Sequence, residues 1–534
     1  MMSRLVTCFG KPDLISVFPS LTPEPEPIKM APPPEVLKDL QGDIWPGLGK
    51  SHETFYLFNI TNPDVFKKRV KALVDQNKIT SAEEALKKRA QNRDPHSAGP
   101  EAGINVGFSP QGMQKLKWFS MDDLGRGNTL TNRQFCDGAG TLALDQGRDI
   151  IEDYDPWMVG HIKGTKVIHG VFIICGDKDS CEAGEALVSK ALGDSVDHIH
   201  SLKGSVRTGE ARGFEHFGFK DTISQPRLEG WDKEDALSLP YQCRPGVIVM
   251  NHPGTNGFDK DVGQWEPEWA KNGSYFVLRQ MEQDVGKFKE HAKKLAEDKS
   301  LGLNLKPHQL EARFVGRWHS GAPLEHFPKE DPAKDKNGPQ WDFGNKWEYN
   351  EPFDEMKCPY GSHIRKSNPR NTFNQSPHNK DKSLIMRRGI PYGTDYSENT
   401  KDDKRGLLFG CYQSNVMNGY ACIMDSKYPL PTEVGAINAS TGWINNDGFP
   451  LKDSGQDVLV AQPIKGAVRD SDKTLHANLY GLDESGNPHV LDSNNQPPAE
   501  KKKRCDFPGF IKIRGGEFFF TPPISFFDKL VNKV

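Results

Sequence analysis

The residue with the clearest capacity for chemistry is His363, which lies in the segment 358–370 with the sequence CPYGSHIRKSNPR. Small and basic residues surround it. A neutral imidazole can bind iron through one ring nitrogen while an acceptor holds the other, and a guanidinium such as that of Arg365 can make bidentate hydrogen bonds to carboxylates. This combination suits a flat, anionic iron porphyrin. A histidine in a basic loop is more often an ordinary surface or core residue, so the segment needs support from elsewhere in the chain.

Two other segments supply that support: 215–226, with the sequence EHFGFKDTISQP, and 385–393, with the sequence IMRRGIPYG. Together the three segments resemble the motifs of dye-decolourising peroxidases, in the longer form common in fungi. In that family a Gly-x-x-Asp-Gly motif lies on the distal side of haem, and a Cys-Pro segment with a histidine lies on the proximal side. Further similarity runs through 40–44, 316–324 and 405–409, so the resemblance covers about residues 36–530.

The resemblance implies a role for each matching residue. His363 corresponds to the axial iron ligand, Asp221 to the distal acid and base, and Arg387 to the distal arginine, while Arg365 is expected only as a partner of a haem propionate. The implied cofactor is haem b (iron protoporphyrin IX), and the implied activity is hydrogen-peroxide-dependent oxidation of phenols and anthraquinone-type dyes. Because bulky dyes cannot reach a buried haem edge, the resemblance also implies surface aromatic residues that pass an electron inward, with Tyr392 as the best placed candidate.

One position departs from the family pattern. Thr222 follows Asp221 where the motif has glycine. Glycine tolerates a positive φ, whereas a β-branched residue does so at considerable cost. Either this turn does not need a positive φ, which the retained Ser-Gln-Pro downstream favours, or the distal loop is displaced and Asp221 points differently. The departure keeps a second hypothesis open, a haem-binding or storage protein with little peroxidase turnover.

The expected distal chemistry follows from the acidity of carboxylic acids. A peroxidase moves a proton between the two oxygens of hydrogen peroxide. An aspartate ordinarily has a pKa of about 3.9, against about 6.5 for a histidine, so a carboxylate is still a base at acidic pH. We therefore expect an acidic activity optimum, with the permanently charged Arg387 stabilising the negative charge that develops. Without the family pattern, Asp221 would be interpreted as a turn cap and Arg387 as an ordinary ion-pair partner.

Two other ligand sets stay open from the residues alone. Cys358 lies near His363 in sequence and could ligate iron as a thiolate. His198 and His200 form a His-x-His pair that a regular strand would place on one face, where it could bind a metal without haem. That pair has no obvious third ligand. The nine cysteines contain no Cys-x-x-Cys pair, which argues against a zinc site or a disulfide scaffold.

Composition narrows the range of partners. The 534 residues are 35% hydrophobic and 26% charged with a net charge of −3, so binding to nucleic acid is not expected. No stretch approaches the roughly 18–20 apolar residues of a membrane span, so no membrane association is expected. Residues 1–20 lack an apolar signal core, which favours a cytoplasmic over a secreted protein. The expected partners are hydrogen peroxide and aromatic reductants, and the oligomeric state stays open.

A framework of helices and strands must position these residues. Apolar runs predict strands at 53–60, 167–174, 246–250, 274–279 and 406–411, and helical spacing predicts helices over 64–73 and from 284 onward. The order of strand and then helix therefore occurs twice, which suggests an internal duplication. Mixed α+β is the predicted class.

The domain organisation combines composition with the resemblance. Clustered prolines predict an extended arm over 1–34. The resemblance implies two ferredoxin-like halves, each an antiparallel sheet with peripheral helices, in a dimeric α+β barrel-like arrangement. We expect the first half, with the distal aspartate, at 35–240 and the second, with the haem ligand, at 241–534. The haem pocket is then expected where the halves meet.

Overall fold

The computed structural model of the protein describes residues 32–91, 101–118, 135–139, 151–221, 225–232, 242–254, 266–332, 347–349, 355–368, 370, 383–424, 457–460, 475–489 and 498–532. Most of the expected proline-rich arm and Thr222 lie outside these residues. Within the described ranges, no helix has the length and apolar character needed to cross a membrane.

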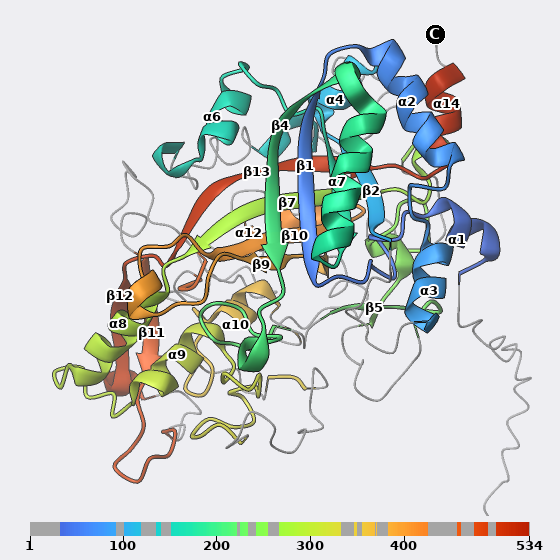
Figure 1. Ribbon diagram of the computed structural model, residues 1–534. Helices are drawn as coiled ribbons and strands as arrows, with labels where there is room; N and C mark the ends of the chain where they lie inside the picture. Colours follow the sequence, from blue (N-terminus) through green and yellow to red (C-terminus); the bar gives the residue numbers. More distant parts are fainter. Residues whose placement is uncertain are drawn as a thin grey trace, which may run out of the picture.

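A nine-stranded sheet forms the framework (Figure 1). Eight strands follow the order β4-β1-β3-β2-β13-β7-β10-β8, and β9 pairs with β10. Neighbouring strands in this sheet run antiparallel. The strands are β1 (His52–Ile60), β2 (Gly103–Phe108), β3 (Gly170–Gly176), β4 (Val196–Ser205), β7 (Ser274–Gln283), β8 (Met386–Arg387), β9 (Ile390–Tyr392), β10 (Gly406–Gln413) and β13 (Ile511–Thr521).

The same strand order occurs twice along the chain. In the first half, β1 lies between β4 and β3, with β2 beyond β3; in the second half, β7 lies between β13 and β10, with β8 beyond β10. A helix follows each first strand, α2 (Pro63–Asp75) after β1 and α8 (Val285–Glu297) after β7. These are two ferredoxin-like units. The predicted α+β class and the predicted internal duplication are therefore confirmed.

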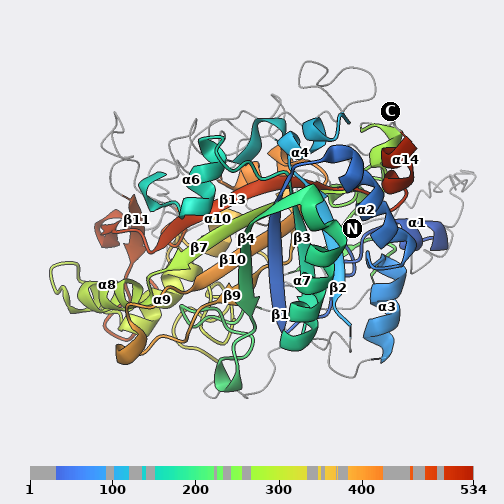
Figure 2. The same ribbon diagram turned by 45° about the horizontal axis from the view of Figure 1, so that its top comes forward.

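The last strand joins the two halves. β13 pairs with β7 over most of its length and reaches β2 through Phe520 and Phe108. On the far side of the sheet, β4 lies beside β9 (Figures 1 and 2), so closely that a Cβ added to Gly204 would lie 2.4 Å from the side chain of Ile390. The sheet thus curls towards a barrel. The division of the chain into domains at 240 and 241 stays a prediction, because both halves share this sheet.

Helices cover the outer face of the curled sheet. α2 and α7 (Lys178–Leu192) pack on the strands of the first half, with α14 (Phe526–Asn532) beside α2 (Figure 1). Phe58, Phe66 and Phe108 are fully buried in this layer. Alternate strand residues point to the inner face, where Phe55 stacks on Phe276 with ring centroids 6.0 Å apart. Aromatic packing therefore holds both sides of the sheet.

The starts of these helices are encoded locally. The side chain of Asn62 accepts a hydrogen bond from the N–H of Val65 at 3.2 Å, and Pro63 occupies the first turn of α2. Asp177 and Ser180 form a reciprocal capping box at the start of α7. Such caps satisfy N–H groups that the helix itself leaves unpaired. This explains why sequence spacing located α2 well.

One predicted strand is wrong. The segment 246–250 lies partly in a 3-10 turn, Pro245–Val247, and not in the sheet. Its N–H groups donate to carbonyls of nearby turns, Gly246 to Pro253 at 2.7 Å and Met250 to Gly273 at 2.9 Å. The segment is nevertheless buried, so its apolar run reflects burial and not strand pairing.

The remaining helices and strands are short or peripheral, and α8, α9, β11 and β12 gather at one end of the molecule (Figure 1). They are α1 (Pro34–Asp39), α3 (Ala82–Gln91), α4 (Pro110–Lys115), α6 (Pro156–Ile162), α9 (Pro307–Val315), α10 (His363–Ser367), α12 (Cys422–Met424), β5 (Arg227–Leu228), β6 (Gln242–Cys243), β11 (Leu475–Tyr480) and β12 (Lys502–Phe507).

Candidate active site

A cavity of about 270 Å³ brings the predicted site residues together. Its wall includes Asp221 from the segment after β4, His363 from α10 and Arg387 from β8. Strands of the second half contribute side chains from β7, β10 and β13. Much of the wall is apolar and consists of Phe219, Met281, Leu384, Ile385, Leu407, Phe409, Met424, Leu459 and Val460. Segments that are far apart in the sequence thus meet around one space.

His363 is held by a carboxylate. It is the first residue of α10, and its Nδ1 lies 2.8 Å from Oδ2 of the buried Asp457. The other oxygen of Asp457 accepts the N–H groups of Leu459 at 3.0 Å and Val460 at 3.2 Å, which fixes the carboxylate. Burial alone would lower the pKa of His363, but the charge and hydrogen bond of Asp457 outweigh it and raise the pKa. With Nδ1 engaged, Nε2 is the nitrogen left to bind a metal.

Asp457 is a functional candidate that sequence reasoning did not find. It lies 94 residues from His363 in the chain. No motif marks it, and an acceptor for a metal-binding histidine can come from any segment that the fold brings near.

Asp221 and Arg387 form an ion pair at the cavity. The guanidinium Nη1 of Arg387 lies 2.6 Å from Oδ1 of Asp221, and the two side chains are 31% and 39% exposed. Solvent-sized molecules can therefore reach both groups. Arg387 comes from β8, where it pairs with Cys411 of β10, whereas Asp221 follows β4 of the first half. The ion pair bridges the two halves of the fold.

A second contact connects the same two segments. The side-chain amide of Gln225 donates to the carbonyl of Arg387 at 2.6 Å and accepts its N–H at 3.1 Å. Because Gln225 and Asp221 belong to the same segment, this contact fixes the backbone of the arginine relative to the aspartate. Gln225 lies in the segment 215–226 that resembles the family motif, but the motif does not predict this contact.

The carboxylate of the half-buried Glu215 shapes the turn before Asp221. Glu215 accepts the N–H groups of Phe217 and Phe219, both at 2.8 Å, and the amide of Gln283 at 2.6 Å. Burial raises the pKa of Glu215 even though these hydrogen bonds favour its charged form. Gly218 within the turn has a φ of 102°, which only glycine adopts easily. The backbone leading to Asp221 is therefore well defined, although Thr222 lies outside the described residues.

The cavity has the chemistry expected of a haem site. A flat porphyrin needs apolar walls, a nitrogen ligand and cations for its carboxylates. The wall supplies the apolar side chains and His363, and it includes Arg317 from the segment 316–324. Arg317 is 5% exposed and donates to the carbonyl of Gly321 at 2.8 Å, which holds its side chain in place. Arg317 is thus a cationic candidate for which the sequence pattern of 316–324 predicts no role.

The expected propionate partner Arg365 lies elsewhere. Its side chain is buried, is absent from the described wall of the cavity, and stacks on the rings of Tyr349 at 4.2 Å and Tyr360 at 4.3 Å. It also donates to the carbonyl of Cys358. Residues two apart on a helix point about 200° away from each other, so α10 turns Arg365 away from the side of His363. The structure gives it a packing role.

Tyr392 differs from the expected surface relay. It is half-buried on β9, its hydroxyl oxygen is inaccessible to solvent, and it packs against the inner core. Burial raises the pKa of its phenol. Tyr392 also does not belong to the described wall of the cavity. Pairing of β9 with β10 places it inside, a position that its sequence distance from Arg387 does not reveal.

The alternative ligand sets are not assembled. Cys358 is buried outside the described cavity wall, with its Sγ 3.2 Å from Oγ of Ser362. His198 and His200 lie across a β-bulge. His198 stacks on Tyr56 and His200 on Trp157, which belong to the core layers on opposite faces of the sheet. The bulge breaks the period-two spacing on which the predicted pair depended.

Comparison with known families defines the class of the protein. Residues 39–208 match the DyP dimeric alpha+beta barrel domain, and residues 336–430 match the C-terminal domain of Dyp-type peroxidases. Both matches agree with the strand order and with the location of His363 and Arg387. The class is therefore a DyP-type α+β barrel with a peroxidase domain.

Individual relatives specify the family. Peroxidase 2 of Mycetinis scorodonius is 31% identical over 508 residues, covering 92% of this chain and 86% of the relative. A dye-decolorizing peroxidase of Auricularia auricula-judae is 29% identical over 97% of this chain and 92% of its own length. The solved structure of an ancestral D-type dye-decolorizing peroxidase has a TM-score of 0.71 and 32% identity, covering 93% of this chain and 99% of that one. The chain belongs to the dye-decolourising peroxidase family.

Proposed function

We propose that this protein is a haem b peroxidase that uses hydrogen peroxide to oxidise phenols and anthraquinone-type dyes. The observation that carries the proposal is the convergence of Asp221, Arg387 and His363 on one cavity. A relative with a TM-score of 0.68 and 28% identity has been solved as a dye-decolorizing peroxidase in complex with 2,6-dimethoxyphenol. That complex supports a phenolic reductant.

Different residues of the cavity wall would bind the cofactor and transfer the proton. Haem b, when bound, supplies the iron at which the O–O bond of hydrogen peroxide is cleaved. His363 would hold the cofactor through Nε2, because Asp457 lies 2.8 Å from Nδ1 and increases the basicity of the ring. Arg317, which belongs to the cavity wall, would neutralise a carboxylate of the cofactor in place of Arg365, which does not belong to that wall.

Asp221 is the proposed proton carrier. Its carboxylate takes a proton from one oxygen of the peroxide and delivers it to the other, which leaves as water. Arg387, 2.6 Å from that carboxylate, orients it and stabilises negative charge on the departing oxygen. Because a carboxylate can accept protons at lower pH than an imidazole, the activity optimum should be acidic.

The Asp221→Asn variant tests this function. An amide cannot accept the proton, so the rate of reaction with hydrogen peroxide should fall by about 10²- to 10⁴-fold while haem stays bound. Stopped-flow absorbance measures that rate. Asp194→Asn is a suitable control, because Asp194 is 90% exposed and pairs with Arg69, and neither residue belongs to the described cavity wall.

The possible outcomes separate the hypotheses. Normal turnover of the Asp221→Asn variant would remove Asp221 from the mechanism. A wild-type protein that binds haem but bleaches no dye would favour the haem-storage function. Failure to bind haem would contradict both.

A further inference from the structure

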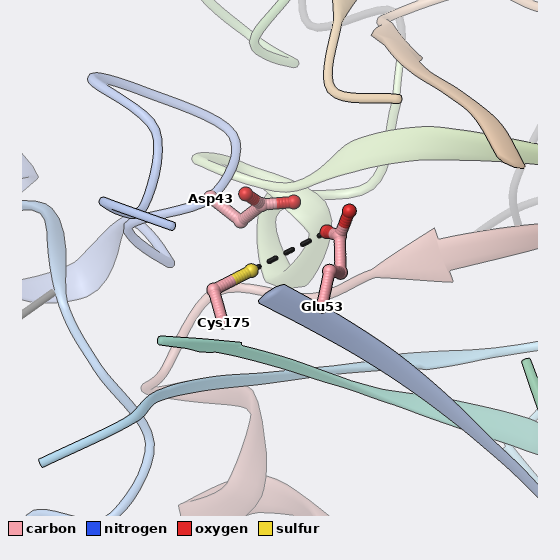
Figure 3. Close-up of side chains that lie close together, drawn as sticks. All are labelled: Asp43, Glu53 and Cys175. Carbon is pink, nitrogen blue, oxygen red and sulfur yellow. Dashed lines mark hydrogen bonds between the residues drawn. The ribbon is translucent and has the colours of Figure 1, made fainter. Parts of the chain in front are cut away.

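A compact group of polar side chains lies inside the curled sheet and does not contribute to the described wall of the proposed haem cavity. It consists of Asp43, Glu53 and Cys175 (Figure 3). Glu53 and Cys175 are directly opposite each other on β1 and β3, and Asp43 comes from the turn after α1. Their exposed fractions are 0% for Asp43, 1% for Glu53 and 0% for Cys175. Two carboxylates and a thiol thus share a space that water does not reach.

The three side chains converge on a common point. One ligand atom from each lies within 4.8 Å of the other two, and Sγ of Cys175 lies 3.3 Å from Oε1 of Glu53. Figure 3 shows the Asp43 and Glu53 carboxylates and the Cys175 sulfur turned towards one another. These donors come from three separate segments, and the pairing of β1 with β3 determines how closely they approach.

Neighbouring groups provide an ion-pair or hydrogen-bond partner for some of the carboxylate oxygens in this cluster. Nζ of Lys50 lies 2.6 Å from Oε2 of Glu53, and the hydroxyl of Tyr412 donates to Oδ2 of Asp43 at 3.0 Å. Oδ1 of Asp43 has no hydrogen-bond partner within the described part of the chain. A buried carboxylate oxygen of this kind costs about 1–3 kcal/mol unless a partner is supplied, and an ordered ion is one such partner.

We propose that Asp43, Glu53 and Cys175 form a binding site for one zinc ion. Zinc binds thiolates at about 2.3 Å and carboxylates at about 2.0–2.2 Å, usually in a tetrahedron, so ligand atoms along an edge lie roughly 3.3–3.8 Å apart. The sulfur–oxygen distance of 3.3 Å, over which the thiol donates to the carboxylate, is of this size. The thiolate ligand favours zinc over magnesium or calcium, which prefer oxygen ligands.

The charges of such a site would balance. A thiolate and two carboxylates carry three negative charges, which two positive charges of zinc and one of Lys50 offset. This compensation matters because unpaired charge is costly in the protein interior. On binding, the S–H bond of Cys175 breaks, the proton leaves to solvent, and a zinc–sulfur bond forms without any change of oxidation state.

A zinc ion here would cross-link three segments of the first half of the fold. It would join β1, β3 and the turn at Asp43. Lys50, which pairs with Glu53, also donates to the carbonyl of Arg388 at 2.6 Å, next to the distal Arg387. The site is distinct from the haem cavity, so its occupancy can be tested separately from peroxidase activity.

The test measures metal content and ligand type. Because the site is buried, the full-length haem protein would be produced in zinc-supplemented medium and passed through a desalting column. Elemental analysis gives the ratio of zinc to haem iron, and zinc-edge X-ray absorption identifies the ligands. We expect about one zinc per chain and one sulfur at about 2.3 Å, with the remaining ligands oxygen.

Matched cysteine variants locate the ion. Cys175→Ser should lower the retained zinc roughly tenfold or more, because a thiolate ligand is lost. Cys181→Ser should retain it, since Cys181 is also buried but belongs to α7 in the outer layer. Glu53→Gln provides a second ligand variant, and haem absorbance reports correct folding in each case.

Clear outcomes would overturn the zinc site. Zinc-free wild-type protein with normal haem absorbance would do so, as would zinc bound without a sulfur ligand. Equal zinc retention by Cys175→Ser and wild type would also contradict it. If Cys175→Ser fails to fold, the zinc-edge X-ray absorption spectrum of the wild-type protein still decides whether sulfur binds the ion.

Discussion

The side chain of Gln225 holds the backbone of Arg387 through two hydrogen bonds, at 2.6 Å to its carbonyl and 3.1 Å to its N–H. An amide that both donates and accepts in this way defines position and orientation together. The arginine whose charge serves the proposed distal chemistry is thereby fixed to the segment that carries Asp221. Placement of Arg387 depends on this contact as well as on the strand pairing of β8.

Gln225→Ala should therefore slow the reaction with hydrogen peroxide without emptying the haem site. Small displacements of a catalytic group are costly, and we expect a loss of about ten- to hundredfold. Stopped-flow kinetics at fixed haem content measure the loss. Gln309→Ala is the matched control, because Gln309 bonds a loop carbonyl beside α9. An unchanged rate for Gln225→Ala would show that β8 alone positions the arginine.

Asp457→Asn should weaken the basicity of His363. The amide can still accept the N–H groups of Leu459 and Val460, but it no longer stabilises positive charge on the imidazole. Such changes next to a metal ligand typically cost about 10- to 100-fold in affinity or activity. We also expect a higher iron reduction potential, measured by spectroelectrochemistry. Asp483→Asn in a surface turn is the control, and an unaltered potential in Asp457→Asn would contradict the proposed role of Asp457.

Arg365 and Arg317 should respond differently to substitution. Arg365→Ala removes a guanidinium that packs between two tyrosine rings, and should lower the free energy of unfolding by about 2–4 kcal/mol. Arg317→Gln removes a cation from the cavity wall, and should accelerate haem loss. Thermal unfolding and haem transfer to an acceptor protein measure the two effects. If Arg365→Ala loses haem faster than Arg317→Gln at equal stability, Arg365 and not Arg317 is the residue that binds the cofactor.

The raised pKa of Glu53 predicts that the free energy of unfolding of the metal-free protein depends on pH. Burial raises the pKa of Glu53 from 4.5 to about 7. Between these values the folded state retains a proton that the unfolded chain releases, so the stability contributed by Glu53 falls as pH rises from 4.5 through 7. Glu53→Gln should remove a fall of about 2–3 kcal/mol across that window. Urea unfolding at several pH values, with a chelator present, measures it.

An exposed glutamate provides the comparison for this pH effect. A hydrogen bond from Lys87 lowers the pKa of Glu83. The stability contributed by Glu83 therefore increases with pH, so Glu83 is not the cause of a decrease in stability as pH rises. Glu83→Gln should therefore keep the wild-type decline. If the free energy of unfolding depends on pH identically in Glu53→Gln and in wild type, the effect assigned to Glu53 is disproved.

Tyr392→Phe should leave dye turnover unchanged. Its hydroxyl oxygen is inaccessible to solvent and its half-buried ring packs against the inner core, so a bulky dye cannot contact the phenol oxygen. Steady-state oxidation of an anthraquinone dye measures the effect. A large decrease, with phenol oxidation and stability retained, would restore Tyr392 as a relay.

The sequence alone identified the family, the α+β class, the internal duplication and three residues of the candidate site. Local signals were sufficient for these features. Helix caps such as Asn62 determine where helices begin, and apolar runs mark strands such as β1 and β10. His363, Asp221 and Arg387 lie within segments whose residue patterns resemble the family motifs, so each could be found without knowing its neighbours in space.

Only the tertiary structure decided which side chains meet. Asp457 reaches His363 across 94 residues, and Glu53 faces Cys175 because of the register between β1 and β3. Arg365 points away from the side of α10 that carries His363, since two residues along a helix turn by about 200°. A β-bulge separates His198 from His200. Sequence patterns report local conformation and burial, whereas side-chain contacts depend on register, helix rotation and the curl of the sheet, which long-range packing determines.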